Sequence, residues 1–402
     1  MNKAKLFTKD FLIITFINFF VSLNFSLLMV IISEFAMIKF NSSPGEAGLL
    51  TGMFIFGALV ARLFTGVWIG RIGQKKTLYI GLVLVLATAC LYFGAASVSL
   101  LLVVRFLHGI SFGIASTSAG TIAAKIVARE RTGEGIGYYG LSVTVAAAVG
   151  PFLSIFISRH GSYSTIFAVC TIFAAFNLIL ALFLSARDVK LTEKQLAEMK
   201  EFKLKNYFEP NVVTISIVCM VIFFCYSSVL SFFSVYAREI NMVEAAGFFY
   251  IVFAAVIILT RPFVGRLFDF KGENLIMYSA ILIFIIGMVI FSQAQAGHIF
   301  LLAGAVIGLG FGALQSSGQA IAVKLTEQHR MGLATSTFYM FADTGMGSGP
   351  WVFGLIIPFT GFRGMYLCVA AIMAACLLLY YLLYGKNAMR GIVKQGDVRP
   401  CE

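Results

Sequence analysis

Charged side chains are scarce in this sequence, and their scarcity excludes an ordinary water-soluble domain. Only 12% of the 402 residues are Asp, Glu, Lys or Arg, whereas soluble domains average about 25%. Hydrophobic residues make up 60% of the chain and gather in runs of roughly 20, the length that a helix needs to cross a bilayer. These runs are apolar around the whole helix, so we expect them to face lipid.

Signatures of catalysis and of metal binding are also missing. The seven cysteines show neither zinc spacing nor a disulfide framework. The histidines are scattered as His108, His160, His298 and His329 instead of clustering as catalytic groups would. No Walker lysine motif, H-E-x-x-H or nucleophile elbow is present. We therefore expect no enzyme, no metal and no cofactor, and an ion gradient in place of ATP as the energy source.

The net charge of +12 does not indicate a nucleic-acid partner. Most basic residues lie in short segments between apolar runs, where positive charge marks the cytoplasmic side of a membrane protein. If the N-terminus is inside, the predicted outer loops hold only Lys39, Arg159, Arg238 and Arg363. We therefore expect a multi-pass protein of the cell membrane with both termini in the cytoplasm. In a Gram-negative bacterium this would be the inner membrane.

The apolar runs predict an all-α membrane protein with twelve transmembrane helices. They lie near residues 11–35, 47–69, 77–96, 100–124, 135–158, 163–185, 212–237, 246–268, 275–294, 299–323, 332–358 and 365–384. The first run is longer than the roughly 7 to 15 residues of a signal-peptide core and has no clear cleavage site. We expect it to stay as the first span.

The longest polar stretch, Ala186 to Pro210, divides the twelve runs into two sets of six. We predict an N-terminal bundle over residues 1–185, a cytoplasmic linker over 186–210, a C-terminal bundle over 211–386 and a cytoplasmic tail over 387–402. Apolar residues recur at near-helical spacing within the linker, which favours an amphipathic helix at the inner interface. A solvated linker fits the composition equally well.

The two sets of six runs are related by an internal repeat at a constant offset of 199 residues. The matched residues include charges and Gly-Pro steps: Arg62 with Arg261, Gly66 with Gly265, Gly73 with Gly272, Gly109 with Gly308, Lys125 with Lys324, Arg131 with Arg330, and Gly150-Pro151 with Gly349-Pro350. Duplicated halves place a substrate path at their interface, as in transporters that work by alternating access.

One repeated segment, the loop after the second run, carries a longer pattern. It follows G-x-x-x-D-R-x-G-x-K with Gly66, Arg71, Gly73 and Lys75, except that Gly70 replaces the acid. The second half keeps the acid, with Gly265, Asp269 and Gly272. This loop resembles the first signature of the major facilitator superfamily, and the resemblance covers nearly the full chain. It implies two pseudo-symmetric six-helix bundles and a cytoplasmic latch at Asp269. Close helix approach and topology explain the loop equally well.

Two further segments resemble signatures of the same family. Arg105, His108, Gly109 and Gly113 occupy the positions of the span 4 signature, which implies a role for Arg105 in proton coupling. His108 is alternatively a hydrogen-bonded packing residue. In span 5, Gly137, Ala146, Gly150 and Pro151 resemble the glycine-spaced pattern of the drug and metabolite antiporters, with Ser154-Ile155 in place of the final small pair. Ordinary small-residue packing would produce a similar pattern.

Several other polar residues within the spans are candidates for transport. Asp343 and Arg62 lie at compatible depths on spans 11 and 2, which face each other in the family that the chain resembles. We therefore predict that Asp343 carries the coupled proton and pairs with Arg62; a permanently paired structural acid is the alternative. Asn18, Asn24 and Arg261 are candidates for the cavity wall. Glu34 is a further proton-coupling candidate or a solvated interfacial acid.

These features together predict a secondary transporter that exports a small organic molecule, a drug-like compound or a metabolite, in exchange for protons. The alternative within transport is a proton symporter that imports a small organic solute. A non-transporting receptor or a membrane enzyme fits poorly. The expected partners are the substrate, protons and the lipid bilayer, and we expect a monomer.

Overall fold

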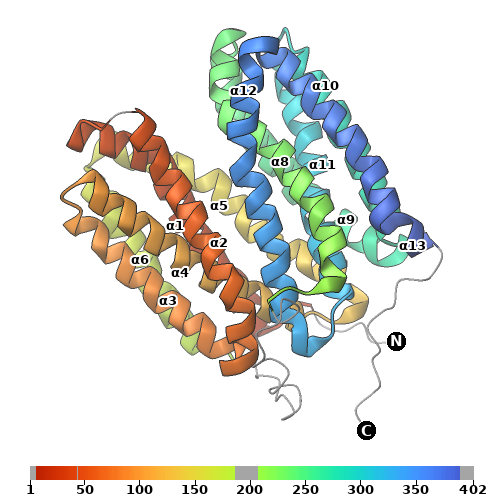
Figure 1. Cartoon of the computed structure of the whole chain (residues 1–402), viewed down its shortest axis with the longest axis horizontal. Helices are drawn as coiled ribbons and strands as arrows, with labels where there is room; N and C mark the ends of the chain where they lie inside the picture. The colour runs from red at the N-terminus through yellow and green to blue at the C-terminus, as the bar shows by residue number, and fades with distance from the viewer. Residues whose placement is uncertain (1–5, 43, 186–206, 390–402) are drawn as a thin grey trace. The chain divides into compact units, whose positions relative to one another are not determined.

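The chain is described by a computed structural model over residues 6–42, 44–185 and 207–389, and its elements are helices joined by short turns (Figure 1). The first six are α1 (Lys9–Phe40), α2 (Pro44–Ile72), α3 (Gln74–Leu91), α4 (Val98–Ile126), α5 (Thr132–His160) and α6 (Tyr163–Leu182). The later ones are α8 (Pro210–Glu239), α9 (Val243–Lys271), α10 (Glu273–Ser292), α11 (Gly297–Lys324), α12 (Met331–Tyr380) and α13 (Lys386–Met389). The predicted amphipathic linker helix lies outside the described residues.

Eleven helices in the described ranges are long and apolar enough to cross a membrane, and they account for all twelve predicted spans. The last two spans share α12, whose backbone leaves the helical region at Gly361 (φ 66°, ψ 177°). A positive φ at this point favours glycine, which has no Cβ to clash. The predicted all-α fold with twelve spans is therefore confirmed, with the final turn between spans reduced to one residue.

Local sequence signals set where the helices begin. The Thr8 hydroxyl accepts from the Phe11 amide at the start of α1, and the Ser97 hydroxyl accepts from the Leu100 amide at the start of α4. Such caps satisfy amides that have no partner within the helix. Gly73 and Gly272, which match in the repeat, precede α3 and α10 with φ values of 93° and 86°. The glycines of the loop signature thus allow the same tight turn in each half.

The described chain forms two compact units that exchange the first turns of one helix each. Unit 1 comprises residues 1–128, 142–209 and 328–337, and unit 2 comprises residues 129–141, 210–327 and 338–402. The start of α5 therefore belongs to unit 2, although the rest of α5 belongs to unit 1. The start of α12 belongs to unit 1 and its remainder to unit 2. The predicted division at the linker alone stays a prediction.

Within each unit, glycines bring repeat-related helices into close contact. A Cβ at Gly109 on α4 would lie 2.9 Å from the carbonyl carbon of Phe54 on α2. Its match Gly308 on α11 stands in the same relation to α9, where a Cβ would lie 2.8 Å from the Phe253 oxygen. Small residues that let backbones approach are the usual means of helix packing in membranes. The sequence repeat is thus also a repeat of packing.

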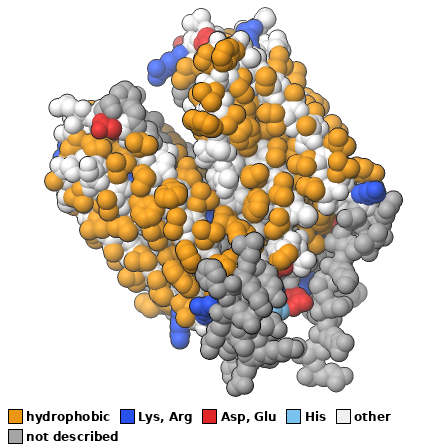
Figure 2. Space-filling view, in the orientation of Figure 1, with side chains coloured by type: hydrophobic (Ala, Val, Ile, Leu, Met, Phe, Trp, Pro, Cys, Tyr) orange, Lys and Arg blue, Asp and Glu red, His pale blue; other side chains and the backbone are white. Residues whose placement is uncertain are grey.

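The outer surface of the helices is apolar, as a lipid environment requires. Large apolar side chains with most of their surface exposed occur along the spans, for example Phe152, Leu259, Phe263 and Phe359. Figure 2 shows hydrophobic side chains over most of the visible helix surface, whereas the charged side chains in view lie mainly near the helix ends. An apolar surface of this extent would be an aggregation liability in water. It identifies a multi-pass membrane protein.

Candidate functional site

The start of α5 is bound to the end of α9 in unit 2. A Cβ at Gly265 would lie 2.7 Å from the Glu134 Cα, so only glycine permits this approach. Four residues later, the Asp269 carboxylate accepts hydrogen bonds from the backbone amides of Gly133 (2.8 Å) and Glu134 (3.0 Å). These amides lie in the first turn of α5, where the helix dipole favours a negative charge. Asp269 therefore caps α5 from another helix within unit 2, and the predicted latch between the two halves stays a prediction.

Two arginines reinforce the contact through Glu134. The Glu134 carboxylate accepts from Arg131 at 2.7 Å and from Arg266 at 3.3 Å, and its side chain is nearly buried. Arg266 is largely exposed, so its pair is screened by water and contributes little, about 0–1 kcal/mol. The capping contact of Asp269, the paired Glu134 and the close approach at Gly265 together form what we call the α5 clasp.

The start of α12 is held in unit 1 by different chemistry. A Cβ at Gly66 would lie 3.0 Å from the Leu333 Cα, which repeats the glycine contact of Gly265. Gly70 supplies no carboxylate, and Leu333 stands where the other repeat has Glu134. The acid comes instead from Glu209, which pairs with Arg330 just before α12. We call this arrangement the α12 clasp.

Residues at the end of the linker complete the α12 clasp. The Glu209 amide donates to the Thr337 hydroxyl at 3.0 Å, and Tyr207 packs against Val67 and Leu333. Sequence reasoning missed both Glu134 and Glu209. Glu134 lies three residues after Arg131, which the repeat pairs with Arg330, and this position was the available signal for it. Glu209 corresponds to Asp10 at the 199-residue offset, an acid that sequence reasoning also did not single out.

The remaining residues of the first-half loop signature lie at the linker side of unit 1, the end at which α6 meets the linker. Gly70 is half-buried and Arg71 is exposed. Lys75 donates to the Leu184 carbonyl, at the end of α6. The last contact ties the loop to the segment that enters the linker, so the signature lysine has a structural partner within its own unit.

Arg261 is buried at the wall of unit 2 that the start of α5 covers. Its Nη1 donates to the Gly312 carbonyl of α11 at 2.6 Å. Its Nε and Nη2 atoms are buried and have no hydrogen-bond partner among the described residues. A Cβ at Gly137 would lie 3.3 Å from the Arg261 Cδ, and one at Gly140 would lie 3.2 Å from its Nη2. The span 5 glycines thus make room for a guanidinium.

Arg105 lies at the centre of a polar network inside unit 1. Its Nε donates to the Leu50 carbonyl at 3.1 Å, and its Nη1 donates to the Tyr92 hydroxyl at 3.4 Å. The same hydroxyl lies 3.0 Å from His108 Nδ1, and the guanidinium lies over the Phe54 ring. The structure thus brings together the two residues that the span 4 signature predicts. Tyr92, which sequence reasoning did not single out, joins them.

Arg62 and Asp343 lie in different units, so their predicted pairing stays a prediction. Arg62 is buried on α2, and its guanidinium carbon lies 6.0 Å from the centre of the Phe112 ring. Its backbone carbonyl accepts from Ser336, in the first turns of α12. Asp343 is half-buried, 12 residues after the start of α12. Both charges therefore lie well inside the spans, where they are costly unless they have a partner or water.

The Gly-Pro steps of α5 and α12 are packing points. A Cβ at Gly150 would lie 3.2 Å from the Leu27 amide of α1, and one at Gly349 would lie 2.7 Å from the Phe224 oxygen of α8. Pro151 and Pro350 follow within the helices, which stay continuous around them. The close approach of α5 to α1 and of α12 to α8 explains these glycines by packing, one of the two alternatives that the sequence left open.

Three other candidates differ in their surroundings. Asn18 is buried and donates from Nδ2 to the Ser142 hydroxyl at 2.7 Å. Asn24 is buried with neither side-chain polar atom bonded among the described residues, which is unusual for an amide. Glu34 is exposed at the end of α1 opposite the linker, with Tyr163 as its neighbour. The geometry thus favours the two asparagines over Glu34 as buried polar groups of the bundle.

Aromatic rings form a cluster in the middle of unit 2. Tyr226 of α8 and Phe311 of α11 stack with centroids 3.6 Å apart, and Phe253 and Phe223 lie beside Phe311. The four rings are 5–8% exposed, so each shows an edge to the surface of the unit. Phe311 immediately precedes Gly312, the partner of Arg261. The repeat places Phe54 and Phe112 in a similar pair in unit 1, with centroids 5.3 Å apart.

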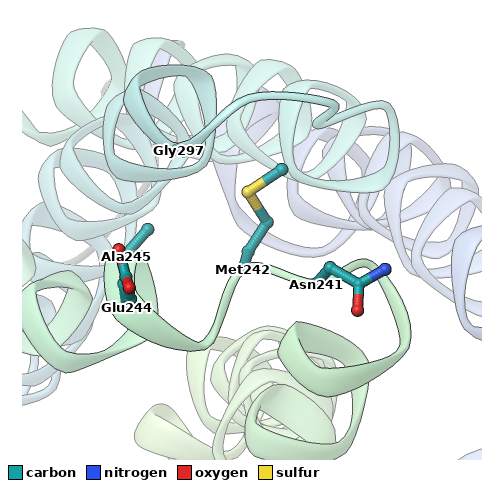
Figure 3. Close-up of a pocket in the computed structure, with 5 residues that line it drawn as sticks. All are labelled: Asn241, Met242, Glu244, Ala245 and Gly297. Atoms are coloured by element: carbon teal, nitrogen blue, oxygen red, sulfur yellow. The ribbon is translucent and has the colours of Figure 1, made fainter.

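A hollow of about 460 Å³ lies at the end of unit 2 opposite the linker. It is lined by Asn241, Met242, Glu244, Ala245 and Gly297. Figure 3 shows Met242 extending from the turn between α8 and α9 toward the segment that carries Gly297. The hollow is open and lies at the helix ends, away from the buried charges. Among the described residues, no group of three His, Cys, Asp or Glu side chains is arranged to hold a metal.

Comparison with known proteins identifies the family. The model of the Major Facilitator Superfamily matches residues 14–316 and 275–396. An uncharacterized MFS-type transporter of Methanocaldococcus jannaschii is 23% identical over 80% of this chain and 84% of its own length. Multidrug resistance protein MdtG of Escherichia fergusonii is 24% identical over 84% of this chain and 82% of its own length.

A solved structure shows the same fold at low sequence identity. The crystal structure of the human organic anion transporter MFSD10 superposes with a TM-score of 0.73 and 12% identity, over 92% of this chain and 98% of that one. Together with the repeated packing of the two units, these matches confirm the resemblance seen in the sequence. The chain belongs to the major facilitator superfamily and is a multi-pass membrane transporter, not an enzyme.

Proposed function

We propose that the protein is a proton-coupled antiporter that exports a small organic molecule by alternating access. The observation that carries the proposal is the exchange of helix starts between the two units. Each exchanged start is held by a glycine contact and a carboxylate. Such contacts are individually weak and can be broken and remade during a transport cycle.

The direction of transport rests on sequence likeness. The MdtG relatives are named multidrug resistance proteins, and the antiporter-like glycine pattern of α5 points the same way. Export is therefore favoured over proton-coupled import. We place the protein in the cell membrane as a monomer with the linker and both termini in the cytoplasm, because the basic residues concentrate on that side.

Proton coupling is assigned to Asp343 and Arg62. A carboxylate without a partner in a low-dielectric site holds its proton, whereas a nearby arginine favours the ionised form. Separation of the pair during the cycle would promote proton uptake, and its reunion would promote release. The Arg105 network offers a second polar centre within unit 1, but it contains no acid among the described residues.

Everted vesicles with an acidic interior test the proposal. Compounds from a panel of organic cations, anions and neutral molecules are added outside, and a pH-sensitive dye reports the internal proton concentration. The proposal predicts that at least one compound collapses the gradient as it enters, and that empty-vector vesicles do not respond. An importing symporter would instead need right-side-out vesicles with external acid. Uptake that saturates with substrate concentration but has the same rate with and without the pH gradient would contradict proton coupling.

A further inference from the structure

Within the described part of the chain, Arg261 is a buried cation without an acidic partner. It lies ten residues before the end of α9, or about 15 Å along the helix axis, and it is only 2% exposed. None of the ion pairs among the described residues includes it. A charge at this depth is costly unless a partner compensates it. One backbone carbonyl, that of Gly312, is the sole acceptor that the described residues offer.

The sequence repeat does not supply the missing acid. Asp343, the predicted partner of Arg62, corresponds at the 199-residue offset to Thr144. The residue that would pair with Arg261 by analogy with Asp343 and Arg62 is therefore Thr144, which has a hydroxyl instead of a carboxylate. The glycines that lie against the guanidinium, Gly137 and Gly140, correspond to Ser336 and Tyr339 in the other repeat. Arg261 therefore has no acid beside it among the described residues, and the part of α5 that lies against its guanidinium carries two glycines, which have no side chains.

We propose that Arg261 binds the anionic group of the transported molecule, which assigns aromatic carboxylates as the substrate class. A guanidinium holds a carboxylate with two parallel hydrogen bonds, and the buried Nε and Nη2 of Arg261 are both available. The aromatic cluster lies along the same helices. Phe311 is adjacent to Gly312, and Phe253 precedes Arg261 by about 12 Å along α9. The rings suit the flat apolar body of such a molecule.

The start of α5 controls access to this site. Its glycines Gly137 and Gly140 cover the guanidinium within unit 2, yet the remainder of α5 from Ser142 belongs to unit 1. Movement of one unit relative to the other therefore withdraws this cover once the α5 clasp opens. The substrate anion then reaches Arg261 in the open state. This inference rests on the proposed transport function but needs no proton gradient.

Three probes with the same ring and different charge test the assignment: 2-naphthoate, 2-naphthamide and 2-naphthylmethylammonium. Each is added to the full-length purified protein in detergent, and the thermal unfolding temperature is followed over a concentration series. A ligand that binds only the folded protein raises this temperature. We expect the naphthoate to stabilise the wild-type protein at concentrations at least about tenfold lower than the amide or the ammonium compound.

Variants at Arg261 provide the decisive comparison. Arg261→Gln is expected to weaken naphthoate binding about 10- to 100-fold while it leaves amide binding unchanged. Arg261→Lys retains the charge and should lose less. Arg238→Gln, which removes an exposed cation at the end of α8, should bind as the wild type does. Without ligand, Arg261→Gln should unfold at the same or a higher temperature, because it removes an uncompensated buried charge.

Three outcomes would overturn the assignment. In the first, naphthoate raises the unfolding temperature of the wild type and of Arg261→Gln equally. In the second, naphthoate raises the unfolding temperature of the wild type no more than the amide or the ammonium compound does. In the third, naphthoate has no effect on this temperature at any concentration. A ligand-free Arg261→Gln protein that unfolds at a clearly lower temperature would also count against it, since that indicates a structural arginine. The two proposals can fail separately: if the vesicles show no proton-coupled export, naphthoate binding to Arg261 can still be observed. Loss of anion binding would likewise leave gradient-driven export of other compounds intact.

Discussion

Asp269 near the end of α9 accepts a hydrogen bond from the amide of Gly133 in the first turn of α5, across 136 residues of sequence. The Asp269 carboxylate thus caps the N-terminus of α5, although it belongs to a different helix. The rest of α5, from Ser142 onward, belongs to the other unit. We propose that this contact opens and re-forms during the transport cycle.

Asp269→Asn should loosen the start of α5. The amide retains one acceptor oxygen but loses the charge that interacts with the helix dipole, a loss of about 1 kcal/mol. We expect faster hydrogen exchange in peptides that cover residues 132–140, with α9 unchanged. Asp10→Asn is the matched control, because Asp10 accepts from the Ser185 amide within unit 1. Equal exchange in wild type and Asp269→Asn would show that the cap contributes nothing.

The α12 clasp should depend on the pair of Glu209 and Arg330. Glu209→Gln leaves the partly exposed arginine without its acid, and Arg330→Gln leaves a buried carboxylate alone. We expect the second to lower the unfolding temperature more, with a cost of about 1–3 kcal/mol. The double variant should lose less than the sum of the two. Glu239→Gln, at an exposed site on α8, is the control, and strict additivity would argue against a direct pair.

The Arg105 network should require the forked donor group of arginine. Arg105→Lys keeps the charge but cannot reach both the Leu50 carbonyl and the Tyr92 hydroxyl with the same geometry. We expect transport to fall severely while the amount of protein in the membrane stays normal. Tyr92→Phe, which removes the shared hydroxyl, should reduce transport as well. Unchanged vesicle transport in both variants would leave only a packing role.

Asp343→Asn should abolish transport driven by the pH gradient and spare substrate binding or exchange. The amide cannot release or take up a proton, so substrate movement loses its link to the gradient. Counterflow of labelled substrate, measured without a gradient, is the companion assay that shows the site intact. If the Asn variant transports with full dependence on the gradient, Asp343 is not the coupling group. The proposed switch with Arg62 would then be wrong too.

Cys401 tests the orientation of the chain. If the tail is cytoplasmic, Cys401 should resist an impermeant thiol reagent added to intact cells and react after the membrane is opened. The expectation rests on the concentration of basic residues in the predicted inner segments. A Cys401→Ser variant shows how much labelling comes from the other cysteines. Rapid labelling in intact cells would reverse the assignment.

Sequence reasoning predicted the helices and the repeat, but it did not identify the acids Glu134 and Glu209 of the two clasps. Apolar runs, buried glycines and charges inside spans are visible in a single sequence because the bilayer imposes them locally. Glu134 and Glu209 escaped notice because an acid at the end of a span looks the same whether it is solvated or paired. Only the fold shows that Glu209 pairs with Arg330 as Glu134 pairs with Arg131.

The sequence also did not predict that the last two spans share α12, or that Arg261 has no acid beside it among the described residues. Gly361 is one glycine among 38, and its positive φ depends on the packing of the helices on either side. The repeat pairs Arg261 with Arg62, and sequence reasoning assigned proton coupling to Arg62 and a place in the cavity wall to Arg261. The difference between them lies in what surrounds each guanidinium, and sequence spacing does not report surroundings.

We propose that the start of α5 leaves unit 2 during transport. Spin labels at Arg129 and Lys271, both exposed on unit 2, allow their separation to be measured by electron–electron double resonance in a protein in which Cys90, Cys368 and Cys401 are replaced by serine. We predict two distance populations, with the longer one enriched by Asp269→Asn and redistributed by a transported compound. A single distance that neither the variant nor the compound changes would contradict the account.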